Sequence, residues 1–392
     1  MPDRHRDLRA TVRAFAESEI VPRIAHMETS AQIEHGLVTA MARQGWIGVT
    51  IPAAYGGMGA SHETKTVVID EISVVNAAMG AAAQASILGM AMIDHFGTEE
   101  QRKEWLPQVA DGTLLPTIAV TEKDSGGHVL GMASTGRPKG KGWILSGRKV
   151  YVGNSHIGGL HGVVVRTGES PRGLTAFLVE HDRKGVSLAP HEPRVGLRGF
   201  SFGELILDQV RVPDSHRIGE VGEGLAVAYS SSVLYGRLNL AAVAVGIHRA
   251  VLEQTTAFVT GRPRIAGEGV VRDRLGAIAA DLRLAELAVY HAARRLDRGE
   301  PCDTDLITAK LQAVGAVQRA TALGMQTHGA AGLLTSLPME RFLRDALCVE
   351  PPAGTSDIQR HRLAQEALAP GRRKQWSERF ARRTPAPLLA PI

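Results

Sequence analysis

The feature that most constrains the fold is a change in residue pattern at two points of the chain, near Pro116 and near Gly224. Before Pro116, apolar residues such as Leu8, Val12 and Phe15 recur at the spacing of an amphipathic helix. Between the two points, short runs of β-forming residues are separated by Gly, Pro and Asp at intervals of roughly ten residues. After Gly224 the helical spacing returns. This order predicts an α+β protein in which a β-region lies between two helical regions.

These changes divide the chain into four regions. Residues 1–116 are expected to form an N-terminal helical domain, and residues 117–224 a central antiparallel β-barrel or sandwich. Residues 225–370 are expected to form a C-terminal four-helix bundle. Residues 371–392 form a basic and then Pro-rich tail, on which we expect no fixed structure. The junction between the β-domain and the helices is the predicted place for a functional site.

Composition excludes several classes of protein. Of the 392 residues, 44% are apolar and 22% are charged, as in an ordinary folded globular protein. Two cysteines, Cys302 and Cys348, are too few for a disulfide framework or a multi-cysteine metal site. We therefore expect a reducing, cytoplasmic location and no bound metal. The first ten residues are rich in Arg and Asp and lack an apolar segment, so no secretory signal is expected.

Neither a membrane span nor a nucleic-acid partner is expected. The longest uncharged stretch, residues 72–93, is mainly Ala, Gly, Met and Ser, so we interpret it as a buried helix rather than one that crosses a bilayer. The net charge is +5 and the pI is about 9.3. However, basic and acidic residues are intermixed outside the tail, and aromatic residues make up only 4%. This pattern favours a solvated surface over nucleic-acid binding.

Several short segments occur in a fixed order along the chain. They are Tyr55-Gly56-Gly57-Met58-Gly59, Ala119-Val120-Thr121-Glu122, Gly196-Leu197-Arg198-Gly199, His328-Gly329-Ala330-Ala331-Gly332 and Ala353-Gly354-Thr355-Ser356-Asp357. Together, over residues 8–368, they resemble the acyl-CoA dehydrogenase superfamily. The resemblance implies two helical domains around a β-domain, which agrees with the pattern of the residues themselves.

The resemblance implies that FAD binds between the β-domain and the C-terminal helices, and that an acyl thioester is oxidised between its α and β carbons. In that family a carboxylate removes the α-proton while the β-hydrogen leaves as a hydride to the flavin. Because the α-proton is weakly acidic, the thioester oxygen needs hydrogen-bond donors, and the base must lie within hydrogen-bond reach of the proton. The flavin supplies the redox chemistry and the protein positions it.

The resemblance also carries a set of cofactor positions over to this sequence. The segment at Val120 and Thr121 is expected to approach the flavin ring, and Tyr151 stands where the family usually has Trp. Some of the positions belong to a part of the family fold that meets the FAD of a neighbouring subunit, which implies a homodimer or homotetramer. The full set is Val120, Thr121, Ser125, Tyr151, Gly153, Thr355 and Gln359, together with Arg262, Gln326 and Gly329 from the part that meets the neighbouring subunit.

Several cofactor positions depart from the family pattern. Gly127 and His128 occupy the places of a serine that contacts the pyrophosphate and of an aspartate. Ser125 would replace that serine only if the loop shifts. Gly153 lacks the hydroxyl that normally faces the flavin. We therefore expect FAD to bind, but more weakly than in members with the full motifs, because hydrogen bonds are lost.

The largest departure is at the catalytic base. The usual position, directly before Gly-Thr-Ser, holds Ala353, and the alternative position on an earlier helix holds Gly236. Ala353 retains its backbone N–H, which can polarise a thioester carbonyl without a side chain. Two residues are candidates to replace the base. They are Glu350, which lies three residues upstream, and His128, whose imidazole suits acid–base chemistry near neutral pH.

Three functions are consistent with these residues. The first is an FAD-dependent oxidoreductase that acts on an acyl thioester of coenzyme A or acyl carrier protein in specialised biosynthesis. The second is a different reaction on the same fold, catalysed by a lyase, hydratase or cyclase with or without FAD. The third is a non-catalytic binding or scaffold protein. Fold alone does not choose among them, and the visible spectrum of the purified protein would show whether flavin is bound.

Overall fold

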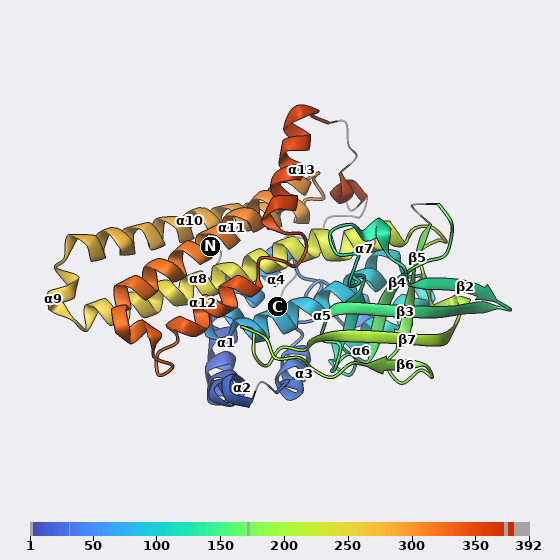
Figure 1. The fold of residues 1–392 in the computed structure, drawn as a ribbon, viewed down its shortest axis with the longest axis horizontal. Coiled ribbons are helices and arrows are strands. Elements are labelled where there is room, and N and C mark those ends of the chain that lie inside the picture. The colour runs from blue at the N-terminus through green and yellow to red at the C-terminus, as the bar shows by residue number, and fades with distance from the viewer. Residues whose placement is uncertain (1–2, 31, 171–172, 372–374, 380–392) are drawn as a thin grey trace.

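The N-terminal part of the chain is helical, as expected. Figure 1 shows the computed structural model, which describes residues 3–30, 32–170, 173–371 and 375–379. A π-helical turn and a 3₁₀ turn lie between the first two helices, at Ala16–Ile20 and Val21–Arg23. The helices are α1 (Asp3–Phe15), α2 (Ile24–Ser30), α3 (His35–Arg43), α4 (His62–Val75), α5 (Ala77–Phe96) and α6 (Glu99–Ala110).

Side chains at the helix starts explain where several of these helices begin. The side chains of Ser61 and Asn76 each accept a hydrogen bond from the first turn of α4 and of α5, respectively. Thr98 and Gln101 form a reciprocal capping box at the start of α6. These caps satisfy backbone N–H groups that have no partner within the helix, so they fix the helix starts.

Helix α5 contains most of the uncharged stretch 72–93 and is buried, which confirms that the stretch is buried. The stretch is not one helix, because residues 72–75 end α4 and Asn76 caps the start of α5. Helix α5 is long and apolar enough to cross a membrane, but 94% of its most apolar window lies inside the protein. Its small residues allow close packing: a Cβ added at Gly89 would lie only 2.6 Å from the carbonyl carbon of Pro116. Glycine at this position therefore lets α5 lie directly against the first strand of the sheet.

A single eight-stranded sheet follows, in the spatial order β6-β7-β3-β2-β4-β5-β8, with β1 paired to β4. Most pairs are antiparallel, as expected, but β1–β4 and the single β2–β4 contact are parallel. The sequence did not predict β2 or β8. The strands are β1 (Pro116–Ala119), β2 (Thr135–Lys139), β3 (Gly142–Gly153), β4 (Leu160–Arg166), β5 (Leu174–Glu180), β6 (Val186–Leu188), β7 (Phe202–Pro213) and β8 (Arg217–Ile218).

The C-terminal part is the predicted helical bundle, in which the long helices α8, α10 and α11 lie side by side (Figure 1). Helix α12 packs on α11, and α13 projects from the body of the protein. A π-helical turn, Tyr229–Tyr235, separates α7 from α8. The helices are α7 (Gly224–Ala228), α8 (Gly236–Thr260), α9 (Pro263–Ala266), α10 (Gly269–Asp297), α11 (Asp303–His328), α12 (Met339–Cys348) and α13 (Ser356–Leu368).

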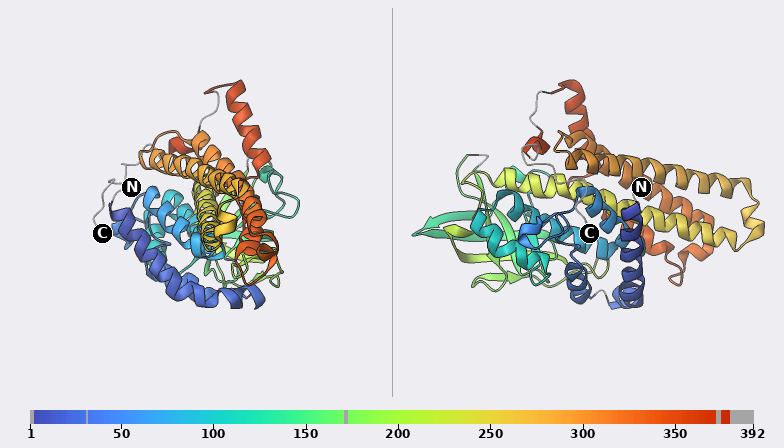
Figure 2. Two further views of the ribbon diagram at one scale, coloured as in Figure 1. Left: turned by 90° about the vertical axis from the view of Figure 1, so that its left-hand side faces the viewer. Right: turned by 180° about the vertical axis from the view of Figure 1, so that it is seen from behind.

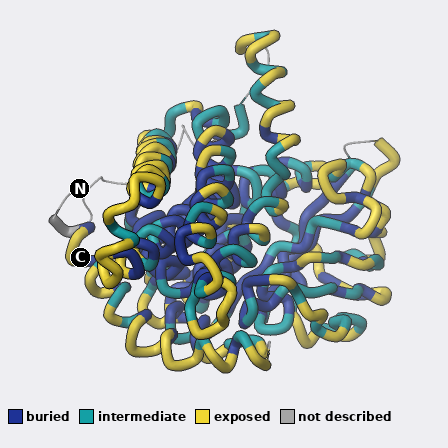
Figure 3. Tube along the Cα trace, turned by 60° about the vertical axis from the view of Figure 1, so that its left-hand side comes forward, coloured by how far each residue is buried: buried dark blue, intermediate teal, exposed yellow. Residues whose placement is uncertain are grey.

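The two helical regions share one hydrophobic core although the sheet separates them in sequence. Buried apolar residues from the N-terminal and C-terminal helices form one continuous cluster, and the sheet has a smaller core of its own. Helix α4 packs closely on α8, because Gly246 leaves room for the backbone of Asp70. Figure 3 shows this buried interior, and Figure 2 shows the sheet at one end of the molecule with the long helices at the other.

Part of the C-terminal tail is structured, contrary to the expectation for residues 371–392. Residues 376–379 form a 3₁₀ turn that packs near the start of α11. The backbone N–H groups of Trp376 and Ser377 donate to the Asp303 carboxylate at 2.8 and 2.9 Å. Residues 372–374 and 380–392 lie outside the described residues.

Candidate active site

The loop between α12 and α13, residues 349–355, contains the position where a catalytic base was expected. Lys310 on α11 is only 2% exposed and contacts this loop. Its ammonium group donates hydrogen bonds to three loop carbonyls, those of Glu350 (2.9 Å), Gly354 (2.5 Å) and Pro352. One buried cation therefore fixes the path of the backbone on both sides of Ala353.

Ala353 has an unusual backbone conformation, with a φ of +55° in the left-handed region. Such a conformation costs a residue with a Cβ of order 1 kcal/mol or more, so the surrounding contacts must maintain it. Gln359 supplies two of these contacts, because its Nε2 donates to the carbonyls of Ala353 (3.0 Å) and Gly354 (3.1 Å). The Oε1 atom of Gln359 is buried and has no hydrogen-bond partner among the described residues. This acceptor is available to a ligand.

The two positions at which the family carries its base face each other. A Cβ added at Gly236 would lie 3.1 Å from the Cβ of Ala353 and 3.8 Å from Leu88 Cδ2. Gly236 is the first residue of α8 and directly follows the π-helical turn, a feature frequent at functional sites. The structure thus brings together two residues 117 positions apart in the sequence, and neither has a side chain that can accept a proton.

The two candidate replacement bases lie in different surroundings. Glu350 is engaged at the start of α13, where its Oε1 accepts a hydrogen bond from the Ser356 N–H at 2.7 Å. His128 is exposed on the loop that follows β1, and its ring lies over Gly131. Glu350 would therefore have to give up its hydrogen bond at the start of α13 in order to act as a base. The His128 ring makes no hydrogen bond to the other described residues.

A buried ion pair shapes the β-domain side of the site. Lys149 on β3 is fully buried and donates to Glu122 Oε1 at 2.7 Å and to the Val120 carbonyl at 3.1 Å. The Thr121 carbonyl accepts from the Val150 N–H at 2.9 Å. These contacts hold the Val-Thr-Glu segment against β3. Glu122 thus has a structural role, while the Thr121 side chain remains only partly buried.

The aromatic residue on β3 is placed where it can cover a planar ligand. Tyr151 is 65% exposed, has a φ of +59° and stacks on Phe202 with ring centroids 5.5 Å apart. Two residues further on, a Cβ added at Gly153 would lie 2.9 Å from Ala85 and 3.1 Å from Phe200. Tight packing against α5 therefore explains why this position lacks the hydroxyl side chain that the family usually has.

The loop after β1 meets the start of α13. A Cβ added at Gly127 would approach only the Ile358 side chain, at 3.8 Å. Ser125 is buried, and its hydroxyl donates to the His128 carbonyl at 2.7 Å, which is a hydrogen bond within the same loop. Thr355 caps α13 through its hydroxyl. Ser125 is therefore occupied within the protein and does not take over the role of the missing serine without a shift of the loop.

The remaining predicted cofactor residues lie at the opposite end of the bundle. Arg262 follows α8, and its guanidinium stacks on the Phe258 ring at 3.7 Å. Gln326 and Gly329, at the end of α11, are exposed. The 25 residues of α8 extend over roughly 37 Å, so this end of the chain is far from Ala353. Within one chain the predicted set forms two groups, and only a second subunit would bring the groups together.

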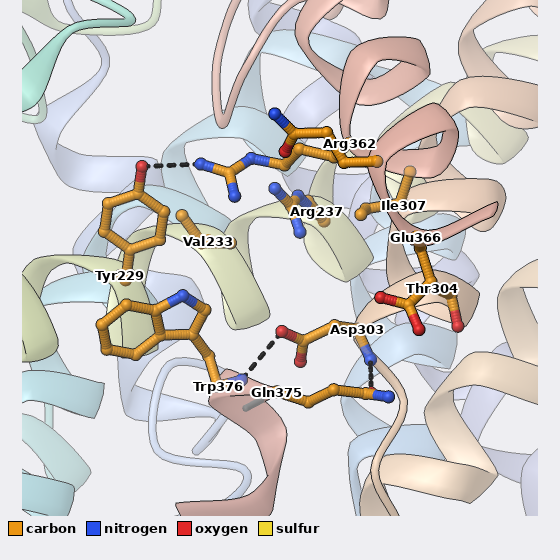
Figure 4. Close-up of a pocket in the computed structure, with 11 residues that line it drawn as sticks. Tyr229, Val233, Arg237, Asp303, Thr304, Ile307, Arg362, Glu366, Gln375 and Trp376 are labelled. Atoms are coloured by element: carbon orange, nitrogen blue, oxygen red, sulfur yellow. Dashed lines mark hydrogen bonds between the residues drawn. The ribbon is translucent and has the colours of Figure 1, made fainter. Parts of the chain in front are cut away.

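A pocket of about 110 Å³, lined by both charged and apolar side chains, lies beside the start of α8 (Figure 4). Arg237, directly after Gly236, is only 3% exposed, and its Nε has no hydrogen-bond partner among the described residues. Burial and the nearby Arg362 guanidinium lower the pKa of Arg237 to about 10. Arg362 donates to the Tyr229 hydroxyl at 2.8 Å. Trp376 also lines the pocket.

Sequence reasoning missed the buried lysines that organise the site. Lys310 lies on the apolar face of α11, four residues after Leu306 and three before Ala313, both of which are buried. A lysine in such a stripe is a sign of a buried charge with a partner. The sequence around Lys149 did not indicate a buried ion pair either, because its partner Glu122 lies 27 residues earlier on a loop. In the described part of the chain, no group of three potential metal-ligating side chains is present.

Comparison with known proteins agrees with this architecture. Models of the acyl-CoA dehydrogenase N-terminal, middle and C-terminal domains match residues 2–113, 117–210 and 222–368. The chain is 32% identical to the probable acyl-CoA dehydrogenase fadE25 of Mycobacterium leprae, over 94% of this chain and 96% of the relative.

Solved structures show the same fold. An acyl-CoA dehydrogenase complexed with FAD from Bacillus anthracis is similar with a TM-score of 0.87 and 25% identity, over 94% of this chain and 67% of that one. The prolyl acyl carrier protein oxidase AnaB is similar with a TM-score of 0.85 and 26% identity, over 94% of this chain and 100% of that one. The fold is that of the acyl-CoA dehydrogenases, with a sheet between two helical regions. The chain belongs to the acyl-CoA dehydrogenase family, whose members are flavoenzymes.

Proposed function

We propose that this protein is an FAD-dependent oxidoreductase that acts on an acyl thioester. The observation that carries the proposal is the loop around Ala353, which Lys310 and Gln359 fix beside Gly236 although both base positions are empty. Ala353 is maintained in a left-handed conformation. Strained backbone of this kind is concentrated at functional sites, so it supports a function for this loop beyond stabilising the fold. The Ala353 N–H would donate to the thioester carbonyl and stabilise the charge that develops there.

The residues at the junction fit a flavin in part. The exposed, stacked ring of Tyr151 offers a surface for a planar ring system, and the unpartnered Oε1 of Gln359 offers a buried acceptor. Val120, Thr121 and Thr355 would complete the contacts from the β-domain and from the start of α13. When bound, FAD would supply the acceptance of a hydride.

Proton removal requires a residue outside the two usual positions. His128 is the candidate that we favour, because Glu350 is occupied at the start of α13, whereas no hydrogen bond of the described residues engages the His128 ring. Anaerobic mixing of the purified flavoprotein with acyl thioesters tests the proposed oxidation, since a substrate would bleach the flavin absorbance. If the protein retains no flavin and takes up none when FAD is added, the proposal fails.

The carrier of the acyl group is coenzyme A or acyl carrier protein. The similarity to AnaB, a prolyl acyl carrier protein oxidase, supports a carrier protein. A role in specialised biosynthesis is part of this proposal. Parallel mixing with an acyl-CoA and with the same acyl group on a carrier protein would distinguish the two.

A second function is favoured by one observation, the loss of both base positions. With Ala353 facing Gly236, the site contains no carboxylate at the places where the family removes a proton. The same fold would then catalyse a non-dehydrogenase reaction, as a lyase, hydratase or cyclase. A protein that binds an acyl thioester and converts it without any change in flavin absorbance would support this alternative.

The first prediction concerns FAD affinity. Gly127→Ser is expected to tighten FAD binding about threefold to tenfold, because it restores a hydroxyl at the position that meets the pyrophosphate in the family. The added side chain has room, since only Ile358 lies near, at 3.8 Å. Flavin fluorescence titration would measure the change. Gly126→Ser is the matched control, because its Cβ meets nothing within 4 Å. Equal affinities of the two variants would contradict the assignment of position 127.

The second prediction concerns assembly. Arg262, Gln326 and Gly329 lie far from Ala353 within one chain, so a complete FAD site requires a second copy. The nearby Leu333 and Leu334 are 71% and 56% exposed, which provides apolar surface for a contact. We expect a homodimer or homotetramer with closed symmetry by light scattering at micromolar concentration. A monomer that still binds FAD tightly would contradict this expectation.

A further inference from the structure

Residues 375–379, which we call the C-terminal strap, bind to the carboxylate of Asp303. Both oxygens of Asp303, the first residue of α11, accept backbone N–H groups of the strap, as described above. The contact is reciprocal, because the Asp303 N–H donates to Gln375 Oε1 at 3.1 Å and the Cys302 N–H donates to Ser377 Oγ at 2.8 Å. The strap and the start of α11 thus satisfy each other's free backbone groups.

The strap also covers the Arg237 pocket. Trp376 stacks on Tyr229 with ring centroids 5.1 Å apart and an interplanar angle of 20°. The Tyr229 hydroxyl in turn accepts from Arg362 on α13 (Figure 4). The strap, the π-helical turn and α13 therefore meet over the pocket, and Arg237 lies beneath them.

The pocket is incomplete as it stands. A buried guanidinium whose Nε lacks a partner is costly, and an acceptor from a ligand would satisfy it. Neither carboxylate in the lining accepts a hydrogen bond from this Nε. Asp303 favours the guanidinium by its charge but accepts from the strap, and Glu366 accepts from the Gly371 N–H at 2.9 Å. A volume of about 110 Å³ also falls below the roughly 300–1,000 Å³ of ordinary ligand pockets.

We propose that the C-terminal strap is a gate: it closes the Arg237 pocket in the free protein and is displaced when the phosphopantetheine arm of the thioester carrier enters. This inference rests on the proposed function, since it assigns the arm of that same substrate. Burial lowers the pKa of Lys310, and the Arg237 guanidinium lies close enough to lower the pKa of that lysine further. Lys310 holds the loop at which the acyl group would react. The pocket is therefore near that loop. Amide and phosphate oxygens of the arm would supply the acceptors that Arg237 lacks.

Asp303 is the residue that holds the strap over the pocket, and we call it the latch residue. Its carboxylate accepts two N–H donors, whereas the amide of Asn offers one oxygen and presents N–H₂ to the second donor, so Asp303→Asn releases the strap with little change in shape. Trp376→Ala removes the cover and leaves the latch residue in place. Asp281→Asn is the matched control, because Asp281 accepts from exposed Arg319 on α11, away from the pocket.

The test uses the full chain with coenzyme A as the probe, and a second titration with phosphopantetheine-loaded acyl carrier protein distinguishes the two carriers. Calorimetry is expected to show about tenfold tighter binding to Asp303→Asn and to Trp376→Ala than to the wild type and Asp281→Asn. Hydrogen exchange at the strap of the wild type is expected to accelerate when the probe is added, because the Trp376 and Ser377 N–H groups lose their acceptor.

Each result decides the proposal. Unchanged or weaker binding in both variants would overturn it, as would strap exchange that saturating probe leaves unchanged, or failure of both probes to bind any variant. Neither measurement depends on flavin reduction. A gate that behaves as expected in a protein that never oxidises a thioester would therefore overturn the proposed function alone.

Discussion

Ala353→Glu is expected to create or raise reduction of bound flavin by a simple acyl-CoA. The substitution restores a carboxylate at the family's usual base position, and a positioned base contributes about 10²–10⁴-fold. Gly236 has no side chain, so the space beside the new glutamate stays open. The backbone at this position is already fixed by Lys310 and Gln359 in the shape that presents the side chain. Anaerobic bleaching of flavin in a stopped-flow experiment measures the gain.

Two variants control for this gain. Ala353→Gln adds the same bulk without a base, so it is expected to remain as slow as the wild type. Ala353→Glu combined with Gly236→Ala places a methyl group against the new side chain and is expected to lose part of the gain. Rates that rise equally in Ala353→Gln and Ala353→Glu would show that bulk, not proton removal, caused the effect.

The wild type distinguishes the remaining possibilities. If it already bleaches with its true substrate, the base lies elsewhere, and His128→Ala or Glu350→Gln should abolish bleaching without loss of FAD. If only Ala353→Glu bleaches, the pocket retains the family's substrate pose and performs a different reaction. If neither bleaches although FAD and thioester both bind, the dehydrogenase assignment is wrong.

The order of helices and strands was predictable because it depends on local pattern. The uncharged segment, most of which becomes α5, is an example, since its small residues already indicated close burial. Strand β2 was missed because its sequence, Thr-Gly-Arg-Pro-Lys, contains Gly and Pro and has no apolar alternation. It forms a strand because it pairs with β3 along its whole length, which is a tertiary effect.

The candidate site was predictable only where the resemblance supplied positions. It implied that Ala353 and Gly236 occupy equivalent roles, and the structure places them in contact distance. The resemblance did not predict the role of Lys310, which lies 43 residues before Ala353, and it did not predict the contact between the tail and Asp303. Both depend on hydrogen bonds between distant segments, for which helical periodicity carries no signal.

Lys310→Met is expected to destabilise the protein by about 3 kcal/mol or more and to abolish any thioester-dependent flavin reduction. Methionine fills a similar volume but donates no hydrogen bond, so three loop carbonyls lose a charged donor in a buried setting. Ala353 would then leave its left-handed conformation, because one of the two groups that hold the loop is gone.

Thermal unfolding and flavin reduction test the two parts of this prediction separately. Lys103→Met is the matched control, because Lys103 on α6 is 69% exposed and pairs with Glu99 at 3.5 Å, a surface contact that contributes little to stability. If Lys310→Met unfolds at the temperature of the control and still reduces its flavin, the lysine does not support the loop. If it is destabilised but reduces flavin at the normal rate, Lys310 contributes to stability alone, and Gln359 by itself is sufficient to keep the Ala353 N–H in position for the thioester carbonyl.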